Sequence, residues 1–264
     1  MKKIGFYGAG NMAQALIAGL LAAGLYQKEE IVVYNHRYEP TLKKLVDTYQ
    51  ITPVLEEADL FAAAELVVLA VKPAILLKVL PNVKPLVTDQ HVLVSIAAGV
   101  TLQQIEALIG ARKIAHAMPN TAAAVDEAMT AVSVNQQVST AESEEIVTLF
   151  RSLGRAKLLP EKQIDAVVGV SGSAPAYVYL FIEALADGAV SEGMARADAY
   201  EFAAQTVLGA AKMVLETGKH PGELKDAVCS PGGTTIAAVC ALEKSGFRSA
   251  VINAVQTAAA KNRE

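Results

Sequence analysis

The sequence predicts two domains, an α/β domain over residues 1–160 and an all-helical domain over residues 161–264. Two observations support this division. Short β-branched runs alternate with helical patterns up to about Pro160, and beyond it Ala, Leu, Val and Glu recur with helical period. Alternating strands and helices are typical of a parallel sheet that is covered on both faces. A chain of 264 residues is long enough for two such domains, each with its own core.

Six segments of the first domain have the composition of β-strands. They span residues 3–7, 31–34, 66–70, 91–95, 113–118 and 129–134. Segments with helical spacing lie between the first four, and they span residues 12–23, 39–49 and 74–80. In the second domain the clearest helical patterns cover residues 177–191 and 199–217. The breaks between these later helices fall at turns that contain glycine or proline.

Composition and charge argue against several classes of protein. Hydrophobic residues make up 53% of the chain, yet no run reaches about 18 uninterrupted apolar residues, and no signal peptide is visible. The net charge is −4 and no basic stripe is present, which argues against a nucleic-acid surface. The two cysteines and four histidines form neither a disulfide framework nor a metal-binding pattern. We therefore expect a cytoplasmic protein with no membrane span, no nucleic-acid partner and no metal.

A glycine motif follows the first predicted strand and opens the first predicted helix, with the sequence Gly8-Ala9-Gly10-Asn11-Met12-Ala13. In that position Gly8 permits a tight turn, Gly10 lets the backbone approach a pyrophosphate, and the small Ala13 allows helix and strand to pack closely. The free N–H groups and the helix dipole attract the diphosphate. The motif predicts that residues 8–12 bind a dinucleotide and that the first domain has a Rossmann-type fold.

The end of the second predicted strand indicates which dinucleotide is bound. An NAD site usually has an acidic residue there, which accepts hydrogen bonds from the ribose 2′-hydroxyl. Here the chain has no acid before Glu39, whereas Arg37 and the amide of Asn35 are suited to a 2′-phosphate. Arg37 has an alternative interpretation as an ordinary solvated cation. The missing acid favours NADPH as the cofactor, with NADH as the second candidate.

Two further strand ends are predicted to contact the cofactor, because ligands bind at the carboxyl edge of such a sheet. Ala70, Val71, Lys72 and Pro73 follow the strand at 66–70, and Ala97 and Ala98 follow the strand at 91–95. The small side chains of Ala97 and Ala98 leave room for a nicotinamide ring against the backbone. Lys72 is equally consistent with a plain exposed lysine, and proline is routine in the first turn of a helix.

The helical domain has more apolar surface than one small bundle can hide. Its stretch of about 100 helical residues contains close-packing runs such as Gly209-Ala210-Ala211. Excess apolar surface predicts a homodimer that is built through this domain. The alternative is that these helices bury their surface on the first domain alone.

A second cluster of small and hydroxyl residues lies between two predicted helices, at residues 226–236. Gly232, Gly233, Thr234 and Thr235 expose several N–H and O–H donors at a helix start, which suits a carboxylate or phosphate. Ordinary helix capping explains the same residues, and for the loop taken alone it is the better explanation. The turn at residues 171–177 has the same two interpretations.

Several longer motifs lie along the chain in order: Ala70-Val71-Lys72-Pro73, Met118-Pro119-Asn120-Thr121, Ser171-Gly172-Ser173-Ala174-Pro175-Ala176-Tyr177, Gly209-Ala210-Ala211-Lys212-Met213, His220-Pro221, Leu224-Lys225-Asp226, Ser230-Pro231-Gly232-Gly233-Thr234-Thr235-Ile236 and Gly246-Phe247-Arg248. Together they resemble the pyrroline-5-carboxylate reductase family over essentially the whole chain. The glycine motif is shared with many dehydrogenases, whereas the loop at 230–236 is very specific.

The resemblance implies NAD(P)H-dependent reduction of 1-pyrroline-5-carboxylate to L-proline, the last step of proline biosynthesis. It implies that Ser230 and Gly232, with the backbone of Gly233, Thr234 and Thr235, bind the substrate carboxylate, and that the Thr235 hydroxyl lies near the ring nitrogen. It further implies an intertwined homodimer through the helical domain, a site that combines one subunit's cofactor domain with its partner's helices, and assemblies as large as a decamer.

Some residues depart from the pattern of the family. Ala174 stands where a glycine is usual, His116 replaces a common arginine, and Ala122, Asp126 and Ala128 replace a proline and two glycines. None of these changes removes an anion-binding group. They bear on fine specificity and not on the reaction class.

The chemistry needs few ionisable groups, because a protonated cyclic imine is already electrophilic at carbon. Thr235 is the predicted catalytic residue, relaying a proton from water to the nitrogen, and Lys72 is the alternative acid. Cys229 beside the loop is interpreted as a buried, inert thiol, with redox sensing as the alternative. A β-hydroxyacid dehydrogenase, a general imine reductase and a non-catalytic NADP-binding scaffold remain alternative functions.

Overall fold

The computed structural model describes residues 3–263 and divides them into two compact units. The first unit contains the described residues up to Gly172 together with those from Ala258 onward, and the second is Ser173–Thr257. Residues 161–172 thus pack with the first unit. The sequence-based domain boundary at residue 160 remains a prediction.

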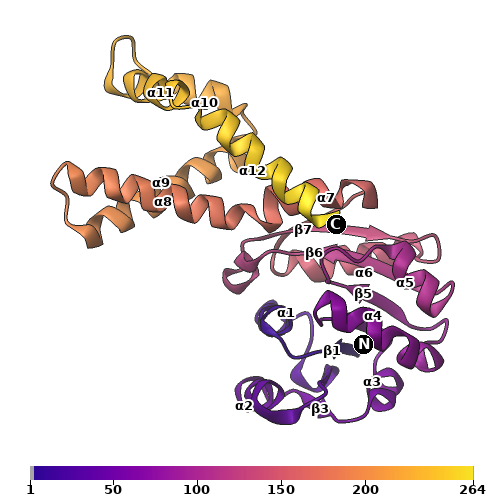
Figure 1. Cartoon of the computed structure of the whole chain (residues 1–264). Helices are drawn as coiled ribbons and strands as arrows, with labels where there is room; N and C mark the ends of the chain where they lie inside the picture. Colours follow the sequence, from indigo (N-terminus) through magenta and orange to yellow (C-terminus); the bar gives the residue numbers. More distant parts are fainter. Residues whose placement is uncertain (1–2, 264) are drawn as a thin grey trace. The chain divides into compact units, whose positions relative to one another are not determined.

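The first unit contains one eight-stranded sheet whose strands lie in the order β3-β2-β1-β4-β5-β6-β7-β8 (Figure 1). All neighbouring strands are parallel except β6 and β7. The first six positions follow the order of a dinucleotide-binding doubly wound fold. The strands are β1 (Ile4–Tyr7), β2 (Ile31–Tyr34), β3 (Thr52–Val54), β4 (Leu66–Leu69), β5 (Val92–Ser95), β6 (Lys113–Met118), β7 (Ala128–Val134) and β8 (Gly154–Leu158).

All six strands that the sequence predicts are present, and β3 and β8 are additional. The prediction missed β3 because it has three residues with Pro53 at its centre, and β8 because its Gly-Arg-Ala-Lys-Leu sequence has no β-branched residue. Proline is tolerated in β3 because this strand is the edge of the sheet.

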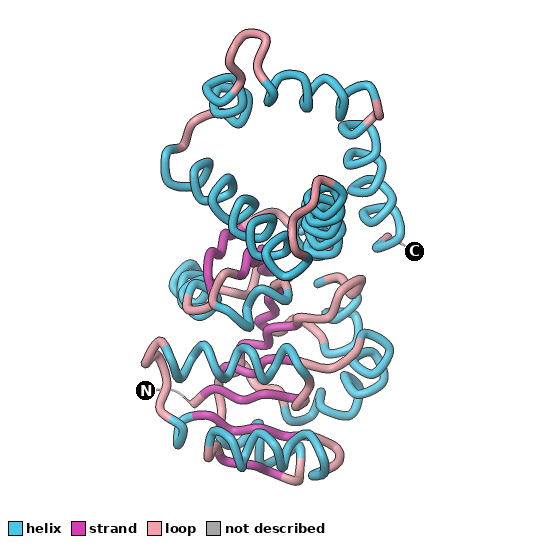
Figure 2. Tube along the Cα trace, turned by 90° about the vertical axis from the view of Figure 1, so that its left-hand side faces the viewer, coloured by secondary structure: helices cyan, strands magenta, loops and turns pink. Residues whose placement is uncertain are grey.

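Two hydrophobic clusters cover the two faces of the sheet, as Figure 2 illustrates with helices on both sides of the strands. Neighbouring residues of β1 alternate between them, with Phe6 in the first cluster and Tyr7 in the second. The first cluster includes residues of α1, α2 and α6, and the second includes residues of α3, α4 and α5. The helices of this unit are α1 (Asn11–Ala22), α2 (Lys43–Tyr49), α3 (Glu57–Ala63), α4 (Pro73–Val83), α5 (Leu102–Ile109), α6 (Thr140–Arg151) and α7 (Ile164–Val167).

The second unit is helical (Figure 2). Its described helices are α8 (Ala174–Ser191), α9 (Arg196–Thr217), α10 (Pro221–Val228), α11 (Thr234–Lys244) and α12 (Phe247–Asn262), the last of which ends in residues of the first unit. The predicted fold class, a Rossmann-type domain followed by helices, is therefore confirmed.

The helices of the second unit have little core of their own. The buried cluster among the residues described there consists of Ala186, Ala199 and Ala203. Large side chains such as Tyr179, Leu180 and Phe202 are more than 60% exposed. In the single chain the apolar faces of α8 and α9 are therefore left in water, which is the condition that favours association.

One helical run among the described residues, 161–191, is long and apolar enough to cross a membrane by length and composition alone. Only 11% of its most apolar window is buried. Apolar helices of protein cores and interfaces satisfy the same criterion, so this run is weak evidence for a membrane span.

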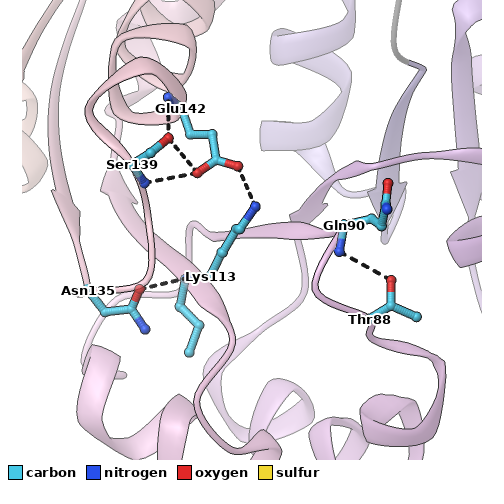
Figure 3. A network of polar contacts seen from close by, with 7 residues as sticks. Thr88, Gln90, Lys113, Asn135, Ser139 and Glu142 are labelled. Atoms are coloured by element: carbon cyan, nitrogen blue, oxygen red, sulfur yellow. Dashed lines mark hydrogen bonds and ion pairs between the residues drawn. The ribbon is translucent and has the colours of Figure 1, made fainter.

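A polar network joins β6 to the start of α6 (Figure 3). Lys113 Nζ donates to Glu142 Oε1 at 2.7 Å, and the backbone and hydroxyl of Ser139 donate to Glu142 Oε2 at 2.9 and 2.7 Å. Burial alone would raise the pKa of Glu142, but the Lys113 and Ser139 contacts outweigh it and lower the pKa to about 2. The carboxylate thus stabilises the folded chain as long as it is ionised.

We expect Glu142→Gln to lower the free energy of unfolding by about 1–2 kcal/mol at pH 7. Because the folded pKa lies below the unfolded value of 4.5, this stabilisation is present above about pH 4.5 and is lost as the pH falls toward 2. Urea unfolding of both proteins across that range measures the difference. Glu144→Gln, an exposed change on the same helix, should alter stability little, and an equal loss there would contradict the assignment.

Candidate active site

The glycine motif forms the turn between β1 and α1. Gly8 has φ +114°, and a Cβ built there would lie 2.5 Å from the carbonyl oxygen of Ala70. Its own N–H donates to the carbonyl oxygen of Tyr34 at 2.8 Å. Only glycine fits this position, because both the dihedral angle and the close approach of β4 exclude a side chain.

Gly10 differs from Gly8 in its backbone angle and in the free space beside its Cα. Its φ is −71°, and a Cβ built there would meet no atom of the protein within 4 Å. It is the N-cap of α1 and makes no side-chain capping bond, so the first N–H groups of the helix, including those of Asn11 and Met12, face no protein cap. Ala13 is fully buried behind them. This arrangement suits a bound diphosphate.

Asn35 links the glycine turn to the loop that follows β2. Its Oδ1 accepts a hydrogen bond from the Ala9 amide at 3.4 Å, and its Nδ2 donates to the Arg37 carbonyl at 2.7 Å and to Thr41 Oγ1 at 3.3 Å. The amide nitrogen that the sequence offered to a 2′-phosphate is thus already engaged within the loop. Arg37 is exposed beside it.

The other predicted cofactor residues lie at the same edge of the sheet. The Ala70 amide donates to the Tyr7 carbonyl at 2.9 Å, and α4 begins with Lys72 as its N-cap and Pro73 in its first turn. The Ala97 amide donates to Ser95 Oγ at 3.3 Å, and Ala98 beyond it is exposed. Since β2, β1, β4 and β5 are adjacent and parallel, their carboxyl ends bring all these residues together.

Two tyrosines near this edge were not singled out by the sequence. The Tyr7 hydroxyl donates a short hydrogen bond to Glu57, and the Tyr7 and Tyr34 rings lie 4.9 Å apart between centroids. Burial and then the Glu57 carboxylate raise the pKa of Tyr7 far above its ordinary value, and burial raises that of Tyr34. Both phenols therefore stay neutral at physiological pH.

The predicted substrate loop lies in the second unit, at the start of α11. Gly232 has φ +68°, and a Cβ on Gly233 would lie 2.3 Å from Ser230 Oγ. Gly233 is the N-cap of α11 and makes no side-chain cap bond. The N–H groups of Thr234 and Thr235 in the first turn therefore face no capping side chain, and the Thr235 side chain is half-buried. Such a turn can hold a carboxylate.

Two further predictions concern cysteine and metal. Cys229, at the C-cap of α10, is half-buried and not buried as the sequence suggested, and Cys240 is exposed. Both are free thiols. Within residues 3–263, no group of three or more His, Cys, Asp or Glu side chains is arranged to hold a metal ion.

The chain matches two family models. Residues 3–99 match the NADP oxidoreductase, coenzyme F420-dependent, model, and residues 161–264 match the pyrroline-5-carboxylate reductase dimerisation model. The first covers the glycine turn and the edge described above, and the second covers the loop before α11.

Curated relatives and solved structures match along almost the whole chain. The pyrroline-5-carboxylate reductase of Escherichia coli is 49% identical over 96% of this chain and 94% of its own length, and that of Methanosarcina acetivorans is 45% identical over 100% and 97%. A Coxiella burnetii pyrroline-5-carboxylate reductase superposes with a TM-score of 0.93 at 33% identity, covering 99% of this chain and 97% of that one. The Plasmodium falciparum enzyme, solved with NADP bound, gives 0.89 at 33% identity with the same coverage. The chain belongs to the pyrroline-5-carboxylate reductase family.

Proposed function

We infer that the chain reduces the C=N bond of 1-pyrroline-5-carboxylate with a nicotinamide cofactor and releases L-proline, the last step of proline biosynthesis. The observation that supports this most strongly is the match to reductases of this name, at up to 49% identity over nearly the full length of both chains. The chain is thus an NAD(P)H-dependent oxidoreductase. NADPH, when bound, supplies the hydride.

The residues at the sheet edge fit the cofactor. Gly8, Ala9 and Gly10, with the first N–H groups of α1 at Asn11 and Met12, hold the diphosphate. The remaining assigned contacts are Asn35, Arg37, Ala70, Val71, Lys72, Pro73, Ala97 and Ala98. Asn35 contributes by hydrogen-bonding the glycine turn to the loop after β2. Arg37 is the cation that binds the 2′-phosphate and so favours NADPH over NADH.

We expect Arg37→Ala to raise the KM for NADPH by about tenfold or more and to leave the KM for NADH nearly unchanged, because only NADPH carries the ribose 2′-phosphate that Arg37 is proposed to contact. Steady-state kinetics with both cofactors measures the ratio. Lys44→Ala, an exposed lysine change on α2, serves as the control for a general loss of positive charge. Equal losses for NADPH and NADH in Arg37→Ala would contradict the assignment.

The loop before α11 is assigned to the substrate. The N–H groups of Thr234 and Thr235 bind the carboxylate, and Ser230, Gly232 and Gly233 shape the turn that presents them. The Gly233 N–H, which the sequence also assigned to the carboxylate, donates instead to the Ser230 carbonyl at 3.0 Å. The Thr235 hydroxyl hydrogen-bonds to the ring nitrogen and relays a proton from water to it. Lys72 is the competing candidate for that role. Correct alignment of the reacting carbon accounts for much of the remaining rate enhancement.

The chain carries a dimerisation domain and forms a homo-oligomer. The finer assembly that we propose is a homodimer through the helices of residues 161–264. The largest form is a decamer built from such dimers, and it acts in the cytoplasm without a membrane or nucleic-acid partner. The exposed apolar faces of α8 and α9 support this arrangement.

The reaction is tested by following the absorbance of NADPH with 1-pyrroline-5-carboxylate added, in parallel with NADH. The expected result is rapid oxidation with L-proline as the product. A folded protein that binds NADPH and oxidises none of it would contradict the proposal. Trials of hydroxyacids with NADP+, and of other cyclic imines with NADPH, would then separate a related dehydrogenase from a scaffold.

A further inference from the structure

A cavity of about 560 Å³ lies in the first unit, and none of its residues is assigned above to cofactor or substrate. It is lined by the start of α5, the middle of β6, the turn at residues 161–163, α7 and the last described residues of the chain. The polar side chains that matter here are His116, Glu161, Lys162, Asp165, Asn262 and Arg263.

His116 is the unusual member of this group. It is 2% exposed, and neither of its ring nitrogens has a hydrogen-bond partner within the described structure. Buried imidazole nitrogens are normally paired, as in His91, whose Nδ1 and Nε2 contact Thr88 and the Phe61 carbonyl at 2.9 and 2.8 Å. An unpaired buried polar group is costly to stability, so this one calls for a ligand or a water.

Glu161 is the acidic neighbour of His116. Glu161 Oε1 accepts the Leu102 amide at 2.6 Å and lies 3.7 Å from His116 Nδ1. Burial alone would raise the pKa of Glu161, but His116 and the Leu102 amide outweigh it and hold the pKa below its usual value. Glu161 is therefore a carboxylate at neutral pH.

The second acid in the cavity already has partners. Asp165 Oδ1 accepts from Asn262 Nδ2 at 2.8 Å, and Asp165 Oδ2 lies 3.7 Å from Arg263. Toward the cavity lie the Glu161 carboxylate, which is 3.7 Å from His116 Nδ1, the Lys162 cation, and the His116 ring, whose nitrogens have no hydrogen-bond partner among the described residues. A plain anion would be repelled by Glu161 and a plain cation by Lys162, whereas a zwitterion satisfies both.

We propose that this cavity binds a free α-amino acid as its zwitterion. The ammonium group pairs with Glu161, and the carboxylate accepts hydrogen bonds from Lys162 and from the ring N–H of His116. The cavity is large enough for a small amino acid with ordered water. The choice of L-proline as the first ligand to test rests on the proposed function, because L-proline is the product; the site itself would make the chain responsive to amino-acid supply.

Titration calorimetry of the full-length protein tests the proposal with L-proline and its two halves. Pyrrolidine carries only the ammonium group, and cyclopentanecarboxylate carries only the carboxylate. We expect two L-proline molecules per chain, one at the substrate loop and one in the cavity, and cavity binding at least about tenfold weaker for either half. One L-proline per chain, or halves that bind the cavity as tightly as the whole, would overturn it.

Two variants isolate the cavity from the substrate loop. His116→Leu removes the unpaired ring, and Lys162→Ala removes an exposed side chain, with Lys157→Ala on β8 as the matched control. The first two should lose one of the two L-proline sites and keep turnover, whereas Lys157→Ala should keep both sites. His116→Leu should also unfold at the same or a higher temperature than the wild type.

The outcomes separate this inference from the proposed function. A protein that turns over 1-pyrroline-5-carboxylate but binds L-proline identically with and without His116 and Lys162 would overturn the cavity site alone. A protein that binds L-proline through His116 and Lys162 but reduces no imine would support the cavity site and contradict the proposed function.

Discussion

Gly10→Ala is expected to weaken NADPH binding by about a hundredfold or more while the chain still folds. The built Cβ meets no protein atom within 4 Å and the φ of −71° suits any residue, so the folded state accepts the methyl group. The same methyl group stands over the first turn of α1, where the diphosphate must approach the backbone. Titration calorimetry with NADPH measures the affinity, and thermal unfolding measures the fold.

Two other glycines make this experiment decisive. Gly8→Ala should impair folding as well as binding, because its Cβ would lie 2.5 Å from the Ala70 carbonyl oxygen. Gly24→Ala has an unfavourable φ of +66° but open space, so it should cost about 1 kcal/mol of stability and leave NADPH affinity intact. A Gly10→Ala protein with the affinity of the wild type would remove the glycine turn from the cofactor site.

Thr235→Ala is expected to lower kcat about 10²–10⁴-fold with a much smaller change in the KM for 1-pyrroline-5-carboxylate. The change keeps the backbone N–H groups at the start of α11, to which the carboxylate is assigned, and removes only the hydroxyl that we propose as the proton relay. Steady-state kinetics at several pH values measures both parameters. Because the Thr235 side chain is only half-buried, we expect little loss of stability, and thermal unfolding checks this directly.

Thr235→Ser and Lys72→Ala serve as controls for the proton-relay role. Serine keeps the hydroxyl and should restore most of the turnover, whereas Lys72→Ala should affect cofactor affinity more than kcat, since Lys72 caps α4 at the cofactor edge. If Thr235→Ala turned over like the wild type and Lys72→Ala did not, Lys72 would be the proton donor.

Local sequence patterns determined most of the secondary structure of this protein and the conformation of its glycine turn. The glycine turn, six strands and the helical second half follow from spacing and composition within short windows, because side-chain period and glycine conformation act locally. The loop from Ser230 to Thr235 was visible as a contiguous run of small and hydroxyl residues, but its assignment to the substrate came from the family resemblance and not from local pattern. The family resemblance then indicated which reaction these motifs serve.

Only the tertiary structure decided what depends on distant segments. β3 and β8 are recognised by the strands they pair with, since their own residues have little strand character. The sequence predicts that the Asn35 amide binds a phosphate, but in the folded chain this amide accepts a hydrogen bond from Ala9 and donates one to Thr41. His116 on β6 lies 3.7 Å from Glu161, and both line a cavity together with Asn262, so this cavity combines a strand, a turn and the last helix. No window of sequence contains these contacts, because they arise only when the packed sheet brings separate elements together.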